Sequence, residues 1–402
     1  MTISTLEVLR RLGQDGLAET SRRAARVAAS FLERRFDTAS LDFPLLPQDV
    51  ADSTVHRAAD GPATPVGTRP LKIAWLCTPP SPGSGGHTTF FRMAAALERR
   101  GAACTVLLYN RHGSDPDRAR RTIRANWPWL AAEVQEVGAR IAGFDAVVAS
   151  SWETAHVSVR RGQAPTRAFY FIQDYEPYFH PRGSLYSLAE DSYRLGLMHI
   201  ALGPMVAEEL RRNVGAEAFV VPFGCDAETY RLLEPGPRSG VAFFARSGTD
   251  RRGGLLGRLA LEELHRRRPD VGLRAFGGPM PAWSVPHEHL GVLSPSELNA
   301  VYNRSKAGMA LSFTNVSLVP GEMLAAGLTP VVNDDPLARA VLEDPRVIWA
   351  RPTPGGIADG LCEALDRSPE PVASSVPAHS GWDETGNAVA DIIESGVRSW
   401  RR

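Results

Sequence analysis

Short apolar runs alternate with segments that carry hydrophobic residues at helical spacing along most of the chain. Residues 87–100 and 204–213 have apolar positions three to four residues apart, so we predict helices there. The apolar runs of the first half, each a predicted buried strand, span residues 71–77, 104–108, 144–149, 168–173, 199–202 and 219–222. Strands that alternate with helices indicate βαβ units, a parallel sheet and right-handed crossovers.

A second series of the same kind follows residues 223–240, a Gly- and Pro-rich stretch that we interpret as an interdomain linker. It begins with predicted strands at 241–245 and 271–276, separated by a helix that ends near residue 268. We therefore predict an α/β protein with two domains, which 402 residues can supply with two cores. The predicted parts are a helical extension and connector at 1–69, a first domain at 70–222, a second domain at 223–380 and a terminal helical segment at 381–402.

Residues 312–332 combine a polar loop, a short helix and a strand around one acidic side chain. We predict that the helix enters near Pro320, carries Glu322 in its first turn and ends at Gly327. Unpaired N–H groups and the helix dipole favour an anion there, and Glu322 could accept hydrogen bonds from sugar hydroxyls beside a bound phosphate. The alternative is that Glu322 only offsets the helix dipole.

Further candidate residues follow predicted strands, at the edge where parallel sheets bind ligands. Gly85 and Gly86 let a ligand approach the backbone just ahead of the first predicted helix. Asp174 follows the fourth predicted strand, where the alternative is a turn or N-cap residue. The loop at 246–254 holds three arginines and three glycines, which suits a diphosphate, although a solvated basic loop is the alternative.

Several classes of protein are disfavoured by the sequence. The second predicted strand ends in Tyr109-Asn110, where an NAD site needs an acid for the ribose, which argues against a dehydrogenase. The 45 basic and 45 acidic residues balance, so no overall charge favours nucleic acid as a partner. No further ligands surround His287-Glu288-His289, so we interpret that run as a loop. The four cysteines are widely spaced, as expected for reduced thiols.

The N-terminal residues 1–36 place leucines and arginines at helical spacing. This segment either packs its apolar side on the first domain, which we favour, or lies on an anionic membrane surface. We find no signal-peptide core, and the uncharged run at residues 307–321 is too short and polar to span a bilayer. We therefore expect a cytoplasmic protein, with peripheral contact at the inner face of the membrane left open.

Taken together, these residues resemble the family-4 retaining glycosyltransferases of GT-B architecture and, more closely, the WsaF-type rhamnosyltransferases. The motifs lie at residues 85–88, 171–177, 244–246 and 312–332, and the resemblance covers roughly residues 70–400. It implies two Rossmann-like domains that face a cleft, with the acceptor on the first and the nucleotide-sugar donor mainly on the second. It also implies that the last helix crosses back to the first domain.

The resemblance assigns four residues to the donor diphosphate. Arg246 and Arg251 look like the basic pair that binds it, and the backbone around Ser317 and Leu318 would meet the phosphates. Arginines and helix dipoles can stabilise a leaving nucleoside diphosphate without a metal. We therefore expect no metal and no cofactor besides the nucleotide-sugar co-substrate.

Two carboxylates are the catalytic candidates under the same resemblance. Glu322 looks like the group that contacts the ribose or sugar of the donor, and Asp174 like a cleft residue that contacts the transferred sugar. Gly86, His87 and Thr314 are the further candidates on the donor-sugar side. Thr314 is a departure, because most family members carry a second Glu at this position, eight residues before the matching one. Its loss removes a usual partner of donor sugar hydroxyls and puts the donor's identity in question.

These matches predict a glycosyltransferase that moves L-rhamnose from dTDP-L-rhamnose onto a glycan or lipid-linked glycan acceptor. Retention of configuration is implied by the family alone. Three alternatives stay open: a UDP- or GDP-hexose donor on the same fold, an inactive GT-B-like scaffold in a polysaccharide assembly complex, and, less favoured, a sugar-nucleotide epimerase. Thr314 is the feature that keeps the scaffold alternative open.

Overall fold

The computed structural model describes residues 43–58, 69–113, 115–226, 228–233, 236–245, 250–278, 283–316, 318–367 and 381–398. The predicted helical segment at 1–36 and the candidate residues Arg246 and Ser317 lie outside the described residues. In the part of the chain that is described, no helix is both long enough and apolar enough to cross a membrane.

Seven strands form the first sheet, and every neighbouring pair is parallel, as predicted. Their order is β3-β2-β1-β4-β5-β6-β7, so β1 lies between β2 and β4. The strands are β1 (Lys72–Cys77), β2 (Ala103–Leu108), β3 (Glu133–Glu136), β4 (Ala146–Ala149), β5 (Arg167–Ile172), β6 (Met198–Leu202) and β7 (Phe219–Val221). The apolar pattern did not predict β3, because only Val134 of this edge strand is buried.

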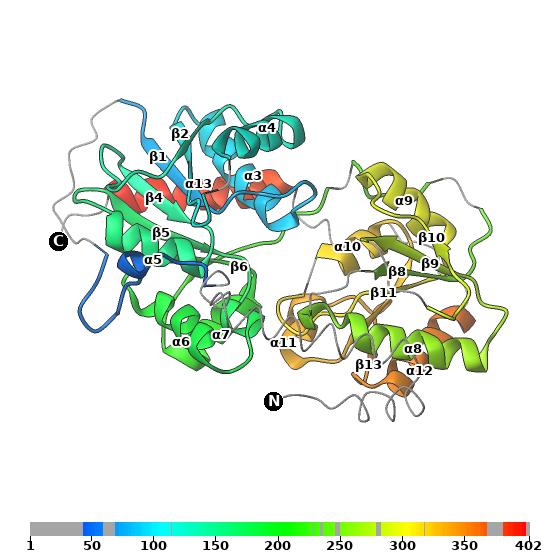
Figure 1. Cartoon of the computed structure of the whole chain (residues 1–402). Helices are drawn as coiled ribbons and strands as arrows, with labels where there is room; N and C mark the ends of the chain where they lie inside the picture. Colours follow the sequence, from blue (N-terminus) through cyan, green and yellow to red (C-terminus); the bar gives the residue numbers. More distant parts are fainter. Residues whose placement is uncertain are drawn as a thin grey trace, which may run out of the picture.

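Helices cover both faces of this sheet (Figure 1). Ile73 and Trp75 of β1 pack into the core on one face, and Ala74 and Leu76 into the core on the other. Burial on both sides explains why the strands are continuous apolar runs. The first face carries α3 (Gly85–Arg99) and α4 (Pro116–Asn126), and the second carries α5 (Trp152–Arg161), α6 (Ser184–Asp191) and α7 (Pro204–Val214).

The start of α3 differs from the prediction. The helix begins at Gly85, and the Ser84 hydroxyl caps it by accepting a hydrogen bond from the His87 N–H. Gly85 and Gly86 therefore form the first helical turn instead of a loop ahead of it.

Six parallel strands form the second sheet, in the order β10-β9-β8-β11-β12-β13. The strands are β8 (Val241–Ala245), β9 (Leu273–Gly277), β10 (Glu288–His289), β11 (Ala307–Met309), β12 (Thr329–Asn333) and β13 (Ile348–Ala350). The helices of this half are α8 (Gly254–Arg267), α9 (Pro295–Arg304), α10 (Leu318–Ala325), α11 (Pro336–Val341) and α12 (Pro354–Asp366). The two sheets form separate lobes, with α8 and α12 packed together in the second (Figure 1).

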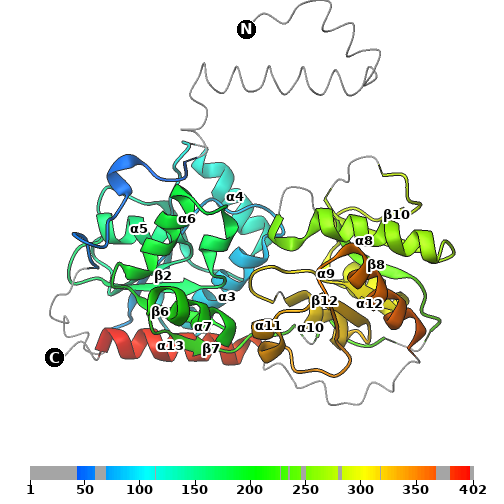
Figure 2. The same ribbon diagram turned by 90° about the horizontal axis from the view of Figure 1, so that it is seen from below.

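The last helix, α13 (Trp382–Arg398), follows the second lobe in the sequence but packs along α3 in the first (Figure 2). Val389 and Ile393 of α13 join the core of the first lobe. The approach to α3 is close at Gly386, where a Cβ would lie 2.6 Å from the Cβ of Ala96. The chain therefore passes between the lobes twice, once between β7 and β8 and once between α12 and α13.

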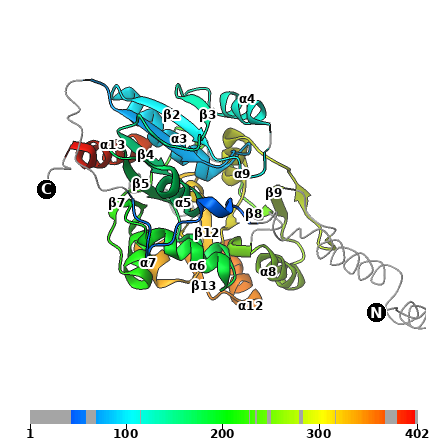
Figure 3. The ribbon, with the colours of Figure 1, turned by 60° about the vertical axis from the view of Figure 1, so that its left-hand side comes forward.

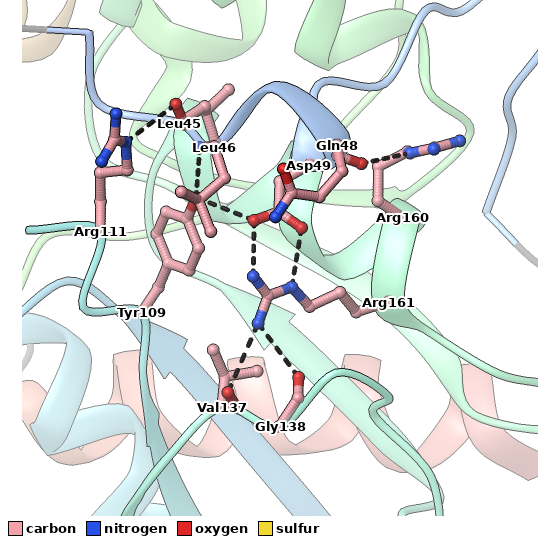
Figure 4. Close-up of polar contacts among 10 residues, drawn as sticks. All are labelled: Leu45, Leu46, Gln48, Asp49, Tyr109, Arg111, Val137, Gly138, Arg160 and Arg161. Atoms are coloured by element: carbon pink, nitrogen blue, oxygen red, sulfur yellow. Dashed lines mark hydrogen bonds and ion pairs between the residues drawn. The ribbon is translucent and has the colours of Figure 1, made fainter. Parts of the chain in front are cut away.

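Residues 43–58 were predicted to be part of an irregular connector, but they pack into the core of the first lobe. The turn η1 (Pro47–Asp49) lies across α5 (Figure 3). Asp49 is 2% exposed and accepts two hydrogen bonds from Arg161, from Nε at 2.7 Å and from Nη2 at 2.6 Å (Figure 4). The Tyr109 hydroxyl donates a third at 3.0 Å. A buried ion pair thus fixes this segment, which we call the N-terminal strap.

Candidate functional site

A cleft of about 1230 Å³ runs between the two sheets. Its walls are the loops that follow β1, β4 and β5 in the first lobe and β8, β9 and β11 in the second, together with α10. These are carboxyl ends of parallel strands, near the points where the strand order of each sheet reverses. The cleft is larger than a typical pocket for one small ligand, about 300–1,000 Å³. The predicted site residues among those lining it are Gly86, His87, Asp174, Arg251, Leu318 and Glu322.

Asp174 lies two residues beyond β5 and is bound by the opposite lobe. The Thr314 hydroxyl donates to its Oδ2 at 2.8 Å, and the Asn315 backbone N–H donates to its Oδ1 at 2.8 Å. Nη2 of Arg252 is 3.9 Å from Oδ2. Burial raises the pKa of Asp174 above its ordinary value, while Arg252 and the two hydrogen bonds oppose the shift. Two site residues predicted from separate stretches, Asp174 and Thr314, are thus direct partners across the cleft.

The basic loop contributes two arginines with different surroundings. The guanidinium of Arg251 lies over the ring of Phe179 in the first lobe, 3.9 Å from its centroid. Nη1 of Arg252 donates to the Ser312 hydroxyl at 2.6 Å and to the Asn315 carbonyl at 3.3 Å. The sequence analysis gave Arg252 no role of its own, since its residue type and position do not distinguish it from Arg251.

Glu322 reaches the cleft from the second turn of α10, so its predicted place in the first turn is wrong. The helix begins at Leu318, two residues before Pro320, because proline is tolerated within the first helical turn, where N–H groups have no helical partner. Burial raises the pKa of Glu322 to about 7. The positive charge of Arg92 opposes this shift, and the negative charge of Asp226 adds to it.

His87 forms part of the cleft wall at the start of α3. Its Nδ1 is 2.8 Å from the Ser84 hydroxyl, and its Nε2 is 3.1 Å from the Thr78 carbonyl. Since a carbonyl can only accept, Nε2 carries the proton and Nδ1 accepts from the hydroxyl. Burial lowers the pKa of His87. The neighbouring Gly86 carbonyl accepts a hydrogen bond from Gln173 Nε2 at 3.0 Å, which ties α3 to the segment around Asp174.

Two further acids line the cleft on the side of the first lobe, Glu153 and Glu176. Burial raises the pKa of both groups, and the charge of Glu153 raises that of Glu176 further. Oε2 of Glu176 accepts a hydrogen bond from the Trp152 N–H at 2.6 Å. The sequence analysis proposed neither as a site residue, although Glu176 lies in the motif at 171–177 and Glu153 follows a predicted strand.

No group of three or more His, Cys, Asp or Glu side chains within the described ranges could hold a metal ion. The expectation of a metal-independent reaction stays a prediction.

Comparison with known proteins bears on the first lobe most directly. Residues 130–203 match the model of the WsaF N-terminal domain, and this range includes Asp174. The chain is also 31% identical over 296 residues to the O-antigen biosynthesis protein RfbC of Myxococcus xanthus. That match covers 70% of this chain but 23% of the relative, so the chain spans only about a quarter of the relative's length.

Solved structures share the architecture of both lobes. A protein described as a UDP-N-acetylglucosamine 2-epimerase from Listeria monocytogenes superposes with a TM-score of 0.54 and 11% identity, covering 83% of this chain and 98% of that one. The pneumococcal O-GlcNAc transferase GtfA, in complex with UDP and GlcNAc, gives a TM-score of 0.51 and 9% identity, covering 82% of this chain and 98% of that one. At such identities the likeness shows the fold alone.

Two parallel sheets that face one cleft, with the last helix packed back on the first lobe, define a GT-B fold, and the predicted fold class is confirmed. Within that class, residues 130–203 match the WsaF N-terminal domain, the type that the sequence resemblance had pointed to.

Proposed function

We propose that the protein is a glycosyltransferase that moves a sugar from a nucleoside-diphosphate sugar to a glycan or lipid-linked glycan during polysaccharide assembly. The observation that carries the proposal is the meeting of Arg251 and Glu322 from the second lobe with Asp174 from the first in one cleft. The relative from Myxococcus xanthus is named for O-antigen biosynthesis, which supports a polysaccharide as the product.

In this proposal the second lobe holds the donor. Arg251 and the N–H groups in the first turn of α10, which begins at Leu318, supply positive charge for the diphosphate. A hydrogen bond between an arginine and a phosphate contributes on the order of 1.5–3 kcal/mol. The ionised Glu322 accepts hydrogen bonds from a donor hydroxyl. The exposed apolar side chains of Phe244 and Val292 line the same lobe's wall and suit a nucleobase.

The first lobe supplies Asp174 to the reacting sugar. As the bond to the diphosphate breaks, positive charge develops on the sugar and negative charge on the leaving group. A fixed carboxylate stabilises the former, and arginine stabilises the latter. We propose L-rhamnose from dTDP-L-rhamnose as the donor, with retention of configuration.

A thermal-shift panel with dTDP, UDP and GDP tests the donor. We expect dTDP to raise the melting temperature most. Stabilisation by UDP but not by dTDP would reject the rhamnose assignment and favour a hexosyltransferase of the same fold.

Nucleotide release from the intact sugar nucleotides tests whether the protein is an enzyme. We expect release that increases when an acceptor glycan is added. A folded protein that releases no nucleotide from any of the three donors would favour the scaffold alternative.

A further inference from the structure

The loop at residues 312–316 makes the closest polar contacts between the two lobes, and these contacts converge on Asp174. Both of its carboxylate oxygens are occupied from the second lobe, by Thr314 and by the Asn315 N–H, each at 2.8 Å. The side-chain amide of Asn315 adds a third contact, donating to the Gln173 carbonyl at 2.8 Å. We call these contacts of residues 314 and 315 with residues 173 and 174 the interlobe clasp.

The second-lobe half of the clasp is held rigidly by its own lobe. Asn333, at the end of β12, bonds the Ser312 N–H and carbonyl through its side chain, at 2.7 and 2.8 Å. The Ser312 hydroxyl donates to the Asn315 carbonyl at 2.6 Å. Arg252 donates to both Ser312 and Asn315. The donors that meet Asp174 are therefore held in place by contacts within the second lobe, so little ordering is needed when they bind Asp174.

The first-lobe half cannot complete its hydrogen bonds alone. Asp174 is 6% exposed, and a buried carboxylate is costly unless hydrogen bonds and positive charge compensate it. The two hydrogen bonds and Arg252 come from the second lobe. When the lobes separate, Asp174 loses these partners and meets water instead.

We propose that Thr314 is a positioning residue: with the Asn315 N–H it captures the Asp174 carboxylate on closure, so the reacting part of the cleft is complete only in the closed form. This inference rests on the proposed function for its catalytic consequence, but the clasp itself can be tested without it. It also explains why a hydroxyl group suits position 314. A hydroxyl donates to Asp174, whereas a carboxylate at this position would place two negative charges together in a buried site.

The test compares Thr314→Val, which keeps the side-chain shape but removes the hydroxyl, with Thr314→Ser, which restores it. We expect Thr314→Val to lower kcat by about 10- to 150-fold, the range for a hydrogen bond to a charged group, and to change nucleoside diphosphate affinity by less than about twofold. Thr314→Ser should recover most of the loss. Thr166→Val, which removes a buried hydroxyl bonded within the first lobe, is the matched control for stability.

Hydrogen exchange of a peptide covering residues 312–316 gives a readout that does not depend on activity. We expect the Asn315 N–H to exchange faster in Thr314→Val and in Thr314→Glu than in the wild type, Thr314→Ser or Thr166→Val. Unchanged exchange in both clasp variants would overturn the clasp. If the wild type releases no nucleotide but the exchange responds as expected, the proposed function fails and the clasp stands. Equal loss of kcat in Thr314→Val and Thr314→Ser would overturn the positioning role.

Discussion

Burial raises the pKa of Glu322 to about 7, although the positive charge of Arg92 lowers it, so Glu322 titrates near neutral pH. Its protonated form can donate a hydrogen bond, whereas only the ionised form offers two charged acceptor oxygens to a donor hydroxyl. The same shift affects stability. The folded state binds this proton more tightly than the unfolded chain, so the contribution of Glu322 to the free energy of unfolding decreases as pH rises from 4.5 to about 7.

Nucleoside diphosphate affinity should therefore depend on pH through Glu322. We expect binding measured by calorimetry to strengthen between about pH 6 and pH 8 in the wild type and to lose this component in Glu322→Gln. Asp226→Asn should move the rise to lower pH, because Asp226 raises the pKa of Glu322. Ionisation of the ligand's phosphate affects binding equally in the wild type and in both variants, so it does not cause a difference between them. Identical profiles for the wild type and Glu322→Gln would contradict the assigned role.

We expect Arg251 to bind the diphosphate of the donor more strongly than it binds the nucleoside or the sugar. Arg251→Ala should weaken nucleoside diphosphate binding about 10- to 150-fold, the loss of 1.5–3 kcal/mol that a charged hydrogen bond contributes. Arg246→Ala should likewise remove most transfer activity while leaving the fold intact. Arg118→Ala, on the exposed side of α4, is the control. Unchanged affinity in Arg251→Ala would mean that the basic loop is a solvated surface.

At the scale of elements, α13 and α3 lie very close together. A larger side chain at their contact should therefore destabilise the protein even where it favours the helix. Replacing a glycine within a helix by alanine normally stabilises the protein by about 0.5–1 kcal/mol. At Gly386 the new Cβ would lie 2.6 Å from the Cβ of Ala96, so the helices must move apart.

We expect Gly386→Ala to lower the free energy of unfolding by about 1–3 kcal/mol, the usual effect of overpacking. Asn387→Ala, on the exposed side of the same helix, should be neutral or slightly stabilising. Urea denaturation of the two variants measures both. A stabilised Gly386→Ala variant would show that α13 does not pack closely on the first lobe.

The N-terminal strap depends on one buried ion pair. Asp49→Ala leaves the part-buried Arg161 without its carboxylate partner. We expect a loss of about 1.5–3 kcal/mol, the contribution of a charged hydrogen bond, because Arg161 keeps its hydrogen bonds to the Val137 and Gly138 carbonyls (Figure 4). The double variant Asp49→Ala/Arg161→Ala should lose less than the sum of the single variants. Asp52→Ala, an exposed aspartate of the same strap, is the control, and thermal unfolding is the measurement. An effect no larger than that of the control would mean that the strap is loosely attached.

For the whole molecule, the sequence predicted the first parallel sheet except β3, because buried strands in such sheets are continuous apolar runs. In the second sheet it predicted no strand at β10 or β13. Polar edge strands such as β3 escaped the same reasoning, since β3 buries one side chain. The strap was also missed, because its attachment depends on Arg161 and Tyr109, distant in the sequence.

Candidate site residues could be proposed from strand ends and from the family resemblance. The residues that form hydrogen bonds with them could not be predicted in this way. The hydrogen bond between Thr314 and Asp174 joins residues 140 positions apart, and no local pattern predicts such a pair. The exact start of α10 likewise depended on where proline falls within the first turn, which moved Glu322 two positions along the helix, from the first turn into the second.

The most direct test of the account is nucleotide release from dTDP-L-rhamnose, UDP-glucose and GDP-mannose, each incubated separately with the wild type and with Glu322→Ala. We expect release from dTDP-L-rhamnose by the wild type, with much less from the other two donors and a large loss in the variant. Equal release by the wild type and Glu322→Ala, or no release from any donor by a folded protein, would contradict the central claim that this cleft transfers a sugar.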